Sequence, residues 1–347
     1  MNGSVHDIVV EKIADFMSAP IPEVFPRDLS LGKLQKPQIG NLVNVIVGIR
    51  RCGKTFRMYQ EMNRIVSEGY KRESILYFNF EDERLKPYDS GLLSDVVETF
   101  QGMVPSAKEQ AFFFFDEIQE VPDWGLFLRR MVDTQKVTMY ATGSSSKMLS
   151  REIATEFRGR SISRELYPLS FSEYARFHYP FIDVETGSSE LSEYDPDAMP
   201  NSVKSYLRQA LPGYLDQGGF IPVQSMSNAD AVQLLQDYAN RAITYDVIDR
   251  YNVSNPALAS SFLARCISHS ARELSINKTN NDFRSLGVRT SRELLSKLLG
   301  YFQESCIVHQ LGEFSRALSD NSKSATKIYA ADTGMFRAFS PAFAQDR

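Results

Sequence analysis

One octapeptide, GIRRCGKT at residues 48–55, limits the fold of this chain more than any other segment. It fits the pattern G-x-x-x-x-G-K-[ST], an apolar and β-branched run at 41–47 precedes it, and a run with helical spacing at 55–62 follows it. A strand, a glycine-rich loop and a helix in this order form a P-loop, in which backbone N–H groups and the positive end of the helix surround a phosphate. The sequence therefore predicts a phosphate-binding loop within an α/β domain.

The P-loop gives individual residues distinct expected roles. Lys54 is predicted to reach the β- and γ-phosphates of a nucleotide, and the hydroxyl of Thr55 is predicted to face Mg²⁺. The other predicted nucleotide contacts are Gly48, Arg51, Cys52, Gly53 and Phe56. For the adjacent Arg50 and Arg51 the sequence leaves three partners open, namely phosphate, solvent or an acid such as Glu81.

A second motif is the apolar run 112–115, which two acids, Asp116 and Glu117, follow directly. They come at the carboxyl end of a predicted strand, where open parallel sheets bind their ligands. We expect Asp116 to hold Mg²⁺ through water, and Glu117 to orient and polarise a water molecule for in-line attack on the γ-phosphate. This is a Walker B arrangement, and the preceding P-loop favours it over two acids that merely end a strand in solvent.

Two further residues are candidates for contacts with the γ-phosphate. Ser144 follows the predicted strand 136–142 and could act as a sensor that hydrogen-bonds the γ-phosphate or the attacking water, although a plain loop with a helix N-cap is the alternative. Arg160 could send its guanidinium to the γ-phosphate of its own subunit or of a neighbouring one. Its alternative is a solvated surface arginine.

The predicted elements divide the chain into four parts. Residues 1–35 are predicted to form an N-terminal helix and a proline-containing linker. In 36–180 strands alternate with helices, which predicts an α/β fold with a parallel sheet covered by helices on both faces. Residues 181–252 contain an acidic stretch and amphipathic helices, which we interpret as a linker and a helical lid. Residues 253–347 show the order of helices and strands of a winged helix.

Several element boundaries have local signals. Strands are predicted at 41–47, 74–80, 111–115, 136–142, 161–167, 306–311 and 327–331, and helices at 5–19, 90–100, 124–132, 201–217, 228–251, 255–273, 277–285 and 291–303. Ser170 is predicted to cap a short helix. Thr290 followed by Glu293 predicts a capping box at the start of the last of these helices.

The composition is that of an ordinary globular protein. With 347 residues and 43% hydrophobic content, the chain has material for two or three domains. No apolar stretch approaches about eighteen residues, and the N-terminus has no basic patch before an apolar run, so we expect a soluble, cytoplasmic protein with no membrane partner. Cys52, Cys266 and Cys306 are widely separated, which argues against a disulfide framework or a zinc site.

The last part of the chain has a local excess of positive charge. Residues 264–327 contain ten Lys and Arg against six Asp and Glu, an excess of four, whereas the whole chain has a formal net charge of −4. With a helix-turn-helix pattern, this excess is compatible with contacts from Arg289, Arg292 and Lys297 to a phosphate backbone. Winged helices also bind proteins, so both kinds of partner stay open.

As a set, the motifs resemble the prokaryotic AAA-type ATPases whose P-loop domain is followed by a C-terminal domain of unknown function. The matching segments are 48–55, 77–82, 116–119, 142–145, 159–160, 167–173, 218–222 and 327–334. The resemblance implies a first domain that binds and hydrolyses ATP with Mg²⁺, and a later winged-helix-like region. In such proteins a nuclease-like segment usually follows the Asp-Thr-Gly element at 332–334. The sequence ends at Arg347, soon after it, so we expect a C-terminal region truncated relative to the family and no nuclease activity.

Two functional hypotheses follow. The first is an ATPase that acts as a conformational switch, alone, as a homo-oligomer or with a protein partner. The second is a DNA-binding winged-helix regulator that uses ATP as a structural or regulatory ligand. A small-molecule kinase is a distant third, because the sequence shows no acceptor pocket and the acid pair favours water as the acceptor.

Overall fold

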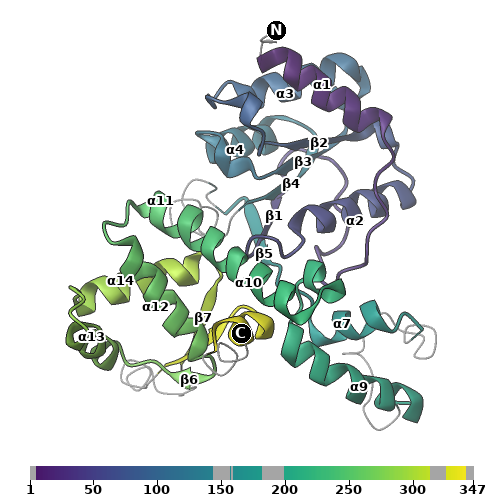
Figure 1. The fold of residues 1–347 in the computed structure, drawn as a ribbon. Helices are drawn as coiled ribbons and strands as arrows, with labels where there is room; N and C mark the ends of the chain where they lie inside the picture. Colours follow the sequence, from purple (N-terminus) through teal and green to yellow (C-terminus); the bar gives the residue numbers. More distant parts are fainter. Residues whose placement is uncertain (1–4, 144–156, 158, 182–198, 313–325, 341–347) are drawn as a thin grey trace. The chain divides into compact units, whose positions relative to one another are not determined.

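The computed structural model of this chain describes residues 5–143, 157, 159–181, 199–312 and 326–340 (Figure 1). The contacts between residues divide the chain into two compact units. The first comprises residues 1–48 and 53–166, and the second comprises 49–52 and 167–347. No helix among the described residues combines the length and the apolar character that crossing a membrane requires.

The sheet of the first unit has five parallel strands in the order β2-β3-β4-β1-β5. This confirms the predicted parallel sheet, and the observed strands differ from the predicted ranges by at most two residues at either end. The strand before the P-loop, β1, is separated from β3, which ends in Asp116, by β4. The five strands are β1 (Val43–Val47), β2 (Ile75–Asn79), β3 (Ala111–Asp116), β4 (Val137–Thr142) and β5 (Ser161–Glu165).

Helices cover both faces of this sheet, as predicted. The longer helices are α1 (Val5–Ser18), α2 (Lys54–Ser67), α3 (Leu92–Met103) and α4 (Trp124–Thr134), and the 3₁₀ turns are η1 (Arg72–Ser74), η2 (Glu83–Leu85), η3 (Pro105–Lys108) and η4 (Ile118–Glu120). Figure 1 shows α1, α3 and α4 together around one side of the sheet and α2 on the other. Alternate residues of a strand point to opposite faces, so each strand contributes to both layers.

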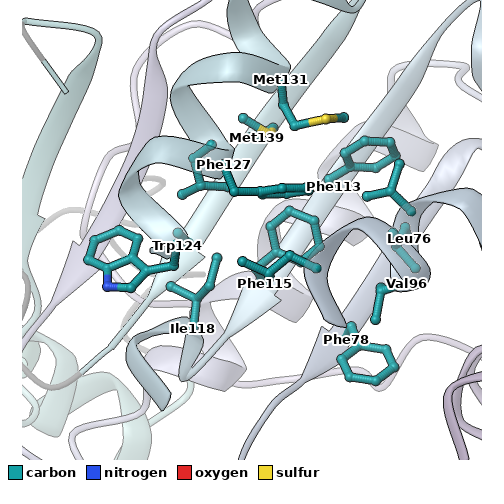
Figure 2. Packing of buried hydrophobic residues seen from close by; sticks show 14 of the residues in the cluster. Leu76, Phe78, Val96, Phe113, Phe115, Ile118, Trp124, Phe127, Met131 and Met139 are labelled. Carbon is teal, nitrogen blue, oxygen red and sulfur yellow. The ribbon is translucent and has the colours of Figure 1, made fainter. Parts of the chain in front are cut away.

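The face toward α1, α3 and α4 is apolar. Phe113 and Phe115 of β3 point into it and pack among Trp124 and Phe127 of α4 (Figure 2). Val9 and Ile13 of α1 are fully buried in the same cluster, so the N-terminal helix belongs to the core of this unit. Each large apolar side chain buried here stabilises the fold by roughly 1.5–3 kcal/mol.

The face toward α2 contains buried polar groups. Glu61 of α2 is 1% exposed, accepts hydrogen bonds from Arg57, and also accepts one from the hydroxyl of Tyr140 at 3.2 Å. Because a buried carboxylate is costly without partners, these three side chains form one interdependent group.

Helix α2 also binds the segment between α1 and β1. Its side chains contact the backbone of that segment at Pro22, Arg27, Leu29 and Gly32, through Asn63, Gln60, Arg57 and Arg64 respectively. The predicted linker is therefore a strap that lies along the helix of the P-loop.

The second unit is mostly helical, with a small sheet in the order β6-β8-β7 whose neighbours are antiparallel. Its helices are α7 (Phe171–His178), α9 (Asn201–Gln217), η6 (Ile221–Ser225), α10 (Asn228–Ile243), a π-helical turn (Thr244–Ile248), α11 (Asp249–Tyr251), α12 (Pro256–Ser268), α13 (Ile276–Ser285), α14 (Arg292–Glu304) and α15 (Thr333–Phe339). Its strands are β6 (Arg272–Glu273), β7 (Val308–Leu311) and β8 (Lys327–Ala330). The predicted acidic linker and the segment between β7 and β8 lie mainly outside the described residues.

One of the two predicted helix caps in this unit is correct. Ser170 caps α7 and forms a full capping box with Glu173, as reciprocal hydrogen bonds of 2.8 and 3.2 Å show. The capping box predicted at Thr290 is wrong, because the helix begins one residue later and Ser291 accepts the hydrogen bond from the N–H of Leu294. Two adjacent hydroxyl residues can serve the same purpose, and the start of the helix decides between them.

Three distant segments of the second unit meet at a buried carboxylate. Asp332 Oδ2 accepts the N–H of Gly219 at 2.7 Å, and Oδ1 accepts the N–H of Gly334 at 2.9 Å, at the start of α15. The N–H of Leu169 in turn donates to the carbonyl of Gly219 at 2.8 Å. We call these four residues the Gly219–Asp332 junction. It ties the segment before α7 and the end of α9 to the start of α15.

The junction predicts a pH dependence of stability. Burial raises the pKa of Asp332 from 3.8 to about 6, although the backbone N–H groups oppose this rise. Since the folded-state pKa lies above the unfolded value, the folded chain binds this proton more tightly. The contribution to stability is complete below about pH 4 and is lost as the pH rises through about 6, and it amounts to on the order of 2–3 kcal/mol.

We therefore expect Asp332→Asn to flatten the pH dependence of the free energy of unfolding between about pH 4 and 7. Urea unfolding of the wild type and the variant at several pH values measures it. Asp216→Asn is the control, because Asp216 lies in the same unit but pairs with Arg337 with its side chain 43% exposed. Equal pH profiles for Asp332→Asn and the wild type would contradict the expectation.

Candidate functional site

The P-loop bends sharply between β1 and α2. Gly48, Arg51 and Gly53 all have positive φ, at 153°, 70° and 104°. Gly53 is the residue before the first turn of α2, and a Cβ there would lie 3.2 Å from the Arg27 guanidinium. The conformation favours glycine, and the close strap residue adds a steric reason. Lys54, the first residue of α2, is thereby placed at the end of the loop.

Lys54 connects the loop to the acid motif. Its ammonium donates to the carbonyl of Gly48 at 3.2 Å and lies 3.7 Å from Glu117 Oε1. The lysine side chain is only 5% exposed. A buried ammonium keeps its charge when nearby oxygens replace water, and phosphate oxygens can take the same role.

Asp116 is the centre of a hydrogen-bond cluster at the carboxyl edge of the sheet. Its side chain is fully buried, and Oδ2 accepts from Thr55 Oγ1 at 2.7 Å, Tyr77 OH at 2.9 Å and Asn79 Nδ2 at 3.4 Å. Oδ1 accepts a short hydrogen bond from Thr142. Burial, and then the neighbouring Glu117, raises the pKa of Asp116, while the hydroxyl donors oppose this rise. A hydroxyl and a carboxylate in contact are oxygen ligands of the kind that Mg²⁺ prefers, so the donor set fits this metal.

Glu117 has an unusual backbone that sets the direction of its side chain. Its φ is 52°, in the left-handed region, and its N–H donates to Thr142 Oγ1 at 3.2 Å. Gln119 donates to its carboxylate at Oε2, opposite the oxygen that faces Lys54. Non-glycine residues seldom adopt this backbone region, and they cluster at functional sites where they do. The carboxylate is thus held between a cation and an amide.

The structure brings four of the predicted site residues together. Lys54, Thr55, Asp116 and Glu117 meet at the carboxyl edge of the sheet, as the contacts above show. Ser144 lies outside the described residues. Two of the other predicted nucleotide contacts differ in exposure. Cys52 is buried in the loop, and Phe56 of the first turn of α2 is 56% exposed.

Arg160 is not at this edge within one chain. It directly precedes β5, and its carbonyl accepts the N–H of Val43, the first residue of β1. A strand rises about 3.3 Å per residue, so the length of β1 separates Arg160 from the P-loop by roughly 16 Å. Its guanidinium pairs with Asp133 at 2.6 Å. The geometry therefore corrects the expectation that Arg160 could reach the γ-phosphate of its own subunit.

Arg50 has a partner that the sequence did not suggest. Residues 49–52 group with the second unit, and there Arg50 forms two hydrogen bonds, of 2.9 and 3.1 Å, with the carboxylate of Asp246 in the π-helical turn. The acid that the sequence offered as an example was Glu81, and Asp246 was not among the candidates. An acid as partner was one of the three alternatives that the sequence left open.

Sequence reasoning missed several residues of the site. Tyr77, Asn79 and Thr142 contact Asp116, Gln119 contacts Glu117, and Arg27 of the strap lies beside Gly53. The register of β2 against β3 places Asn79 beside Asp116, and this signal depends on the strand order. Nothing in the sequence pattern indicates Arg27.

The comparison with known families agrees with this geometry. Residues 40–175 match an AAA domain. The first unit therefore has the α/β P-loop NTPase fold, in a form similar to AAA-type ATPases. Residues 208–346 match a domain of unknown function, DUF8612. The segment that matches the AAA domain thus contains every residue of the cluster around Asp116.

Relatives extend over both regions. The uncharacterized protein MJ1544 of Methanocaldococcus jannaschii is 30% identical over 310 residues, which are 89% of this chain and 64% of that protein. An uncharacterized protein of Haemophilus influenzae is 24% identical over 299 residues, 86% of this chain and 69% of its own length. The chain thus spans about two thirds of the length of these relatives.

Solved structures also match. The Walker-type ATPase PABY2304 of Pyrococcus abyssi aligns with 86% of this chain and 90% of its own, at 14% identity and a TM-score of 0.48.

Proposed function

We propose that this protein binds ATP and hydrolyses it with Mg²⁺, and that the AAA domain thereby acts as a conformational switch. The observation that carries the proposal is the convergence of Lys54, Thr55, Asp116 and Glu117 at one sheet edge. Similarity of residues 40–175 to an AAA domain supports it.

Each residue has a chemical task in this proposal. Backbone N–H groups of residues 48–55 bind the phosphates, and Lys54 exchanges the carbonyl of Gly48 for phosphate oxygens. Glu117 accepts a proton from the attacking water, while Gln119 keeps its carboxylate in place. Thr55 and Asp116 would hold Mg²⁺, which when bound supplies positive charge to the phosphate oxygens. The remaining proposed contacts with ATP are Gly48, Arg51, Cys52, Gly53 and Phe56.

Ser144 and Arg160 complete the proposed site. Ser144 follows β4, whose last residue, Thr142, contacts both acids, and this supports a sensor role just beyond it. Because Arg160 lies at the opposite edge of its own sheet, we assign its contact to the γ-phosphate of a neighbouring subunit. The proposal therefore includes a homo-oligomer.

We also propose a winged-helix arrangement for the end of the second unit. The order α12-β6-α13-α14-β7-β8 and the antiparallel order β6-β8-β7 support it. The comparisons lend no support to the alternative of a DNA-binding regulator, and none of the contacts around Arg289, Arg292 or Lys297 favours DNA over a protein as partner. The switch would act on a protein partner or on a second copy.

Phosphate release by the purified chain tests the proposed reaction. We expect turnover of ATP with Mg²⁺ and a loss of at least about 100-fold when the metal is chelated, because the phosphate charge is then uncompensated. Mass determination with ATP bound measures the assembly, and added duplex DNA should leave the rate unchanged. Absence of Mg²⁺-dependent phosphate release would refute the ATPase, whereas a DNA-stimulated rate would make DNA a partner of the switch.

A further inference from the structure

The hydrogen bonds of Asp116 are more numerous than the P-loop motif requires. The motif itself accounts for the contact with Thr55. Two more donors to the same oxygen, Tyr77 and Asn79, come from β2, an adjacent strand that carries neither the P-loop nor the acid motif. Their side chains lie within the segment that matches the AAA domain.

Strand register explains how β2 reaches this carboxylate. Asn79 lies directly beside Asp116, and Tyr77 lies beside Phe114, two residues earlier on the same face. Only a long side chain can span that offset, and the tyrosine hydroxyl reaches Asp116 Oδ2 at 2.9 Å. Asn79 makes the longer contact of 3.4 Å.

Packing on both sides holds the ring of Tyr77 in place, independently of the hydrogen bond that its hydroxyl makes. It packs between Phe16 of α1 and Tyr59 of α2, with ring centroids 5.3 Å apart in both cases. A ring held on two sides has little freedom to turn its hydroxyl away, so the donor is preorganised.

The bond from Tyr77 bears directly on a metal at this site. Thr55 can face Mg²⁺ with an oxygen lone pair and still donate its hydroxyl hydrogen to Asp116, so both residues can serve the metal while the carboxylate keeps this donor. The orientation of the fully buried carboxylate then depends on its other short-range donors, Tyr77 and Thr142. Outer-shell partners of this kind orient a metal-binding carboxylate, and their loss typically lowers metal affinity about 10- to 100-fold.

We propose that Tyr77 is a positioning residue, whose hydroxyl holds Asp116 in the orientation that binds Mg²⁺ with the nucleotide. This inference rests on the proposed function and adds a residue to its metal site. It assigns Tyr77 no contact with ATP or with the reacting water.

The test is the gain in nucleotide affinity that Mg²⁺ produces, which needs no turnover. Calorimetry with a non-hydrolysable ATP analogue, with Mg²⁺ or with a chelator, gives this gain for each variant. For Tyr77→Phe, which removes one oxygen and keeps the ring, we expect unchanged affinity without the metal and a gain about tenfold smaller with it. In the ATPase assay the Mg²⁺ requirement should rise about tenfold, while saturating Mg²⁺ restores most of kcat.

Tyr140→Phe is the matched control. Tyr140 is also buried in this sheet and also donates to a buried carboxylate, but that carboxylate belongs to Glu61. It should lose stability by an amount similar to that of Tyr77→Phe and keep the wild-type gain from Mg²⁺. Thermal unfolding of both variants measures this loss of stability.

A wild-type gain in Tyr77→Phe would overturn the inference. Should that variant not fold, Tyr77→Leu, which also lacks the hydroxyl, takes its place, and a wild-type gain there would overturn the inference equally. Wild-type protein that shows no gain from Mg²⁺ would instead refute the proposed metal-dependent function. The two failures are therefore distinguishable.

Discussion

Glu117→Gln is expected to slow phosphate release about 100- to 10,000-fold while nucleotide affinity stays the same or rises. Glutamine keeps the shape of the side chain and an oxygen for the hydrogen bond from Gln119, but it cannot accept a proton from water. It also removes the negative charge 3.7 Å from Lys54, so the ammonium becomes more available to phosphate. Parallel measurements of turnover and of analogue binding separate the two effects.

Lys54→Ala should behave differently from Glu117→Gln. Removal of the ammonium lowers both affinity and turnover, because the cation that serves phosphate is lost. Glu120→Gln is the control, since it removes one carboxylate from the 3₁₀ turn η4, which directly follows Glu117, and should leave turnover unchanged. Turnover close to the wild type in both Lys54→Ala and Glu117→Gln would contradict the assigned roles.

Gly219→Ala is expected to destabilise the second unit by about 3 kcal/mol. A Cβ at this position would overlap the backbone carbonyl of Leu169. The overlap cannot be relieved by a side-chain rotation, because Leu169 is bound to Gly219 through its own N–H, and Gly219 is bound to Asp332. Urea unfolding should show a lower transition midpoint with an unchanged slope.

Gly300→Ala provides the comparison for that change. Gly300 lies inside α14 of the same unit, and no atom would lie within 4 Å of a Cβ there. Alanine is the better helix former, so this variant should be as stable as the wild type or up to about 1 kcal/mol more stable. If Gly219→Ala were as stable as Gly300→Ala, the close approach of backbone atoms at the Gly219–Asp332 junction would not limit stability.

Local patterns were sufficient to predict the five strands of the parallel sheet and the place of the acid pair, whereas β6 falls within the helix predicted at 255–273. The run 112–115 is apolar because β3 is buried on both faces, and Asp116 could only stand at its end, where the sheet opens. The P-loop limits the position of Lys54 and Thr55 in the same way. The order of strand, loop and helix along the chain was therefore enough to predict one shared sheet edge for Lys54, Thr55, Asp116 and Glu117.

The position of Arg160 could also have been predicted, and it was not. This arginine directly precedes a predicted strand, and in a parallel sheet that position lies at the amino edge, opposite the ligand. The sequence-based hypothesis considered the chemistry of the side chain and omitted the direction of the strand.

Other features depend on contacts between distant segments. The role of Tyr77 requires β2 to be the neighbour of β3, and no local pattern gives the strand order. The strap along α2 is fixed by single hydrogen bonds to backbone groups, which leave no periodic signal. The Gly219–Asp332 junction joins residues more than a hundred positions apart.

The two faces of the central sheet should differ in how freely this chain can diverge. On the side of Phe113 and Phe115, only volume and apolar character are needed, so exchanges among large apolar residues that conserve volume cost little. On the side of Tyr77 and Asp116, hydroxyls and carboxylates are joined by specific hydrogen bonds, so an exchange that conserves volume still removes a donor or an acceptor. Lineages of this protein would therefore accumulate change on one layer of the sheet while the other layer stays nearly constant.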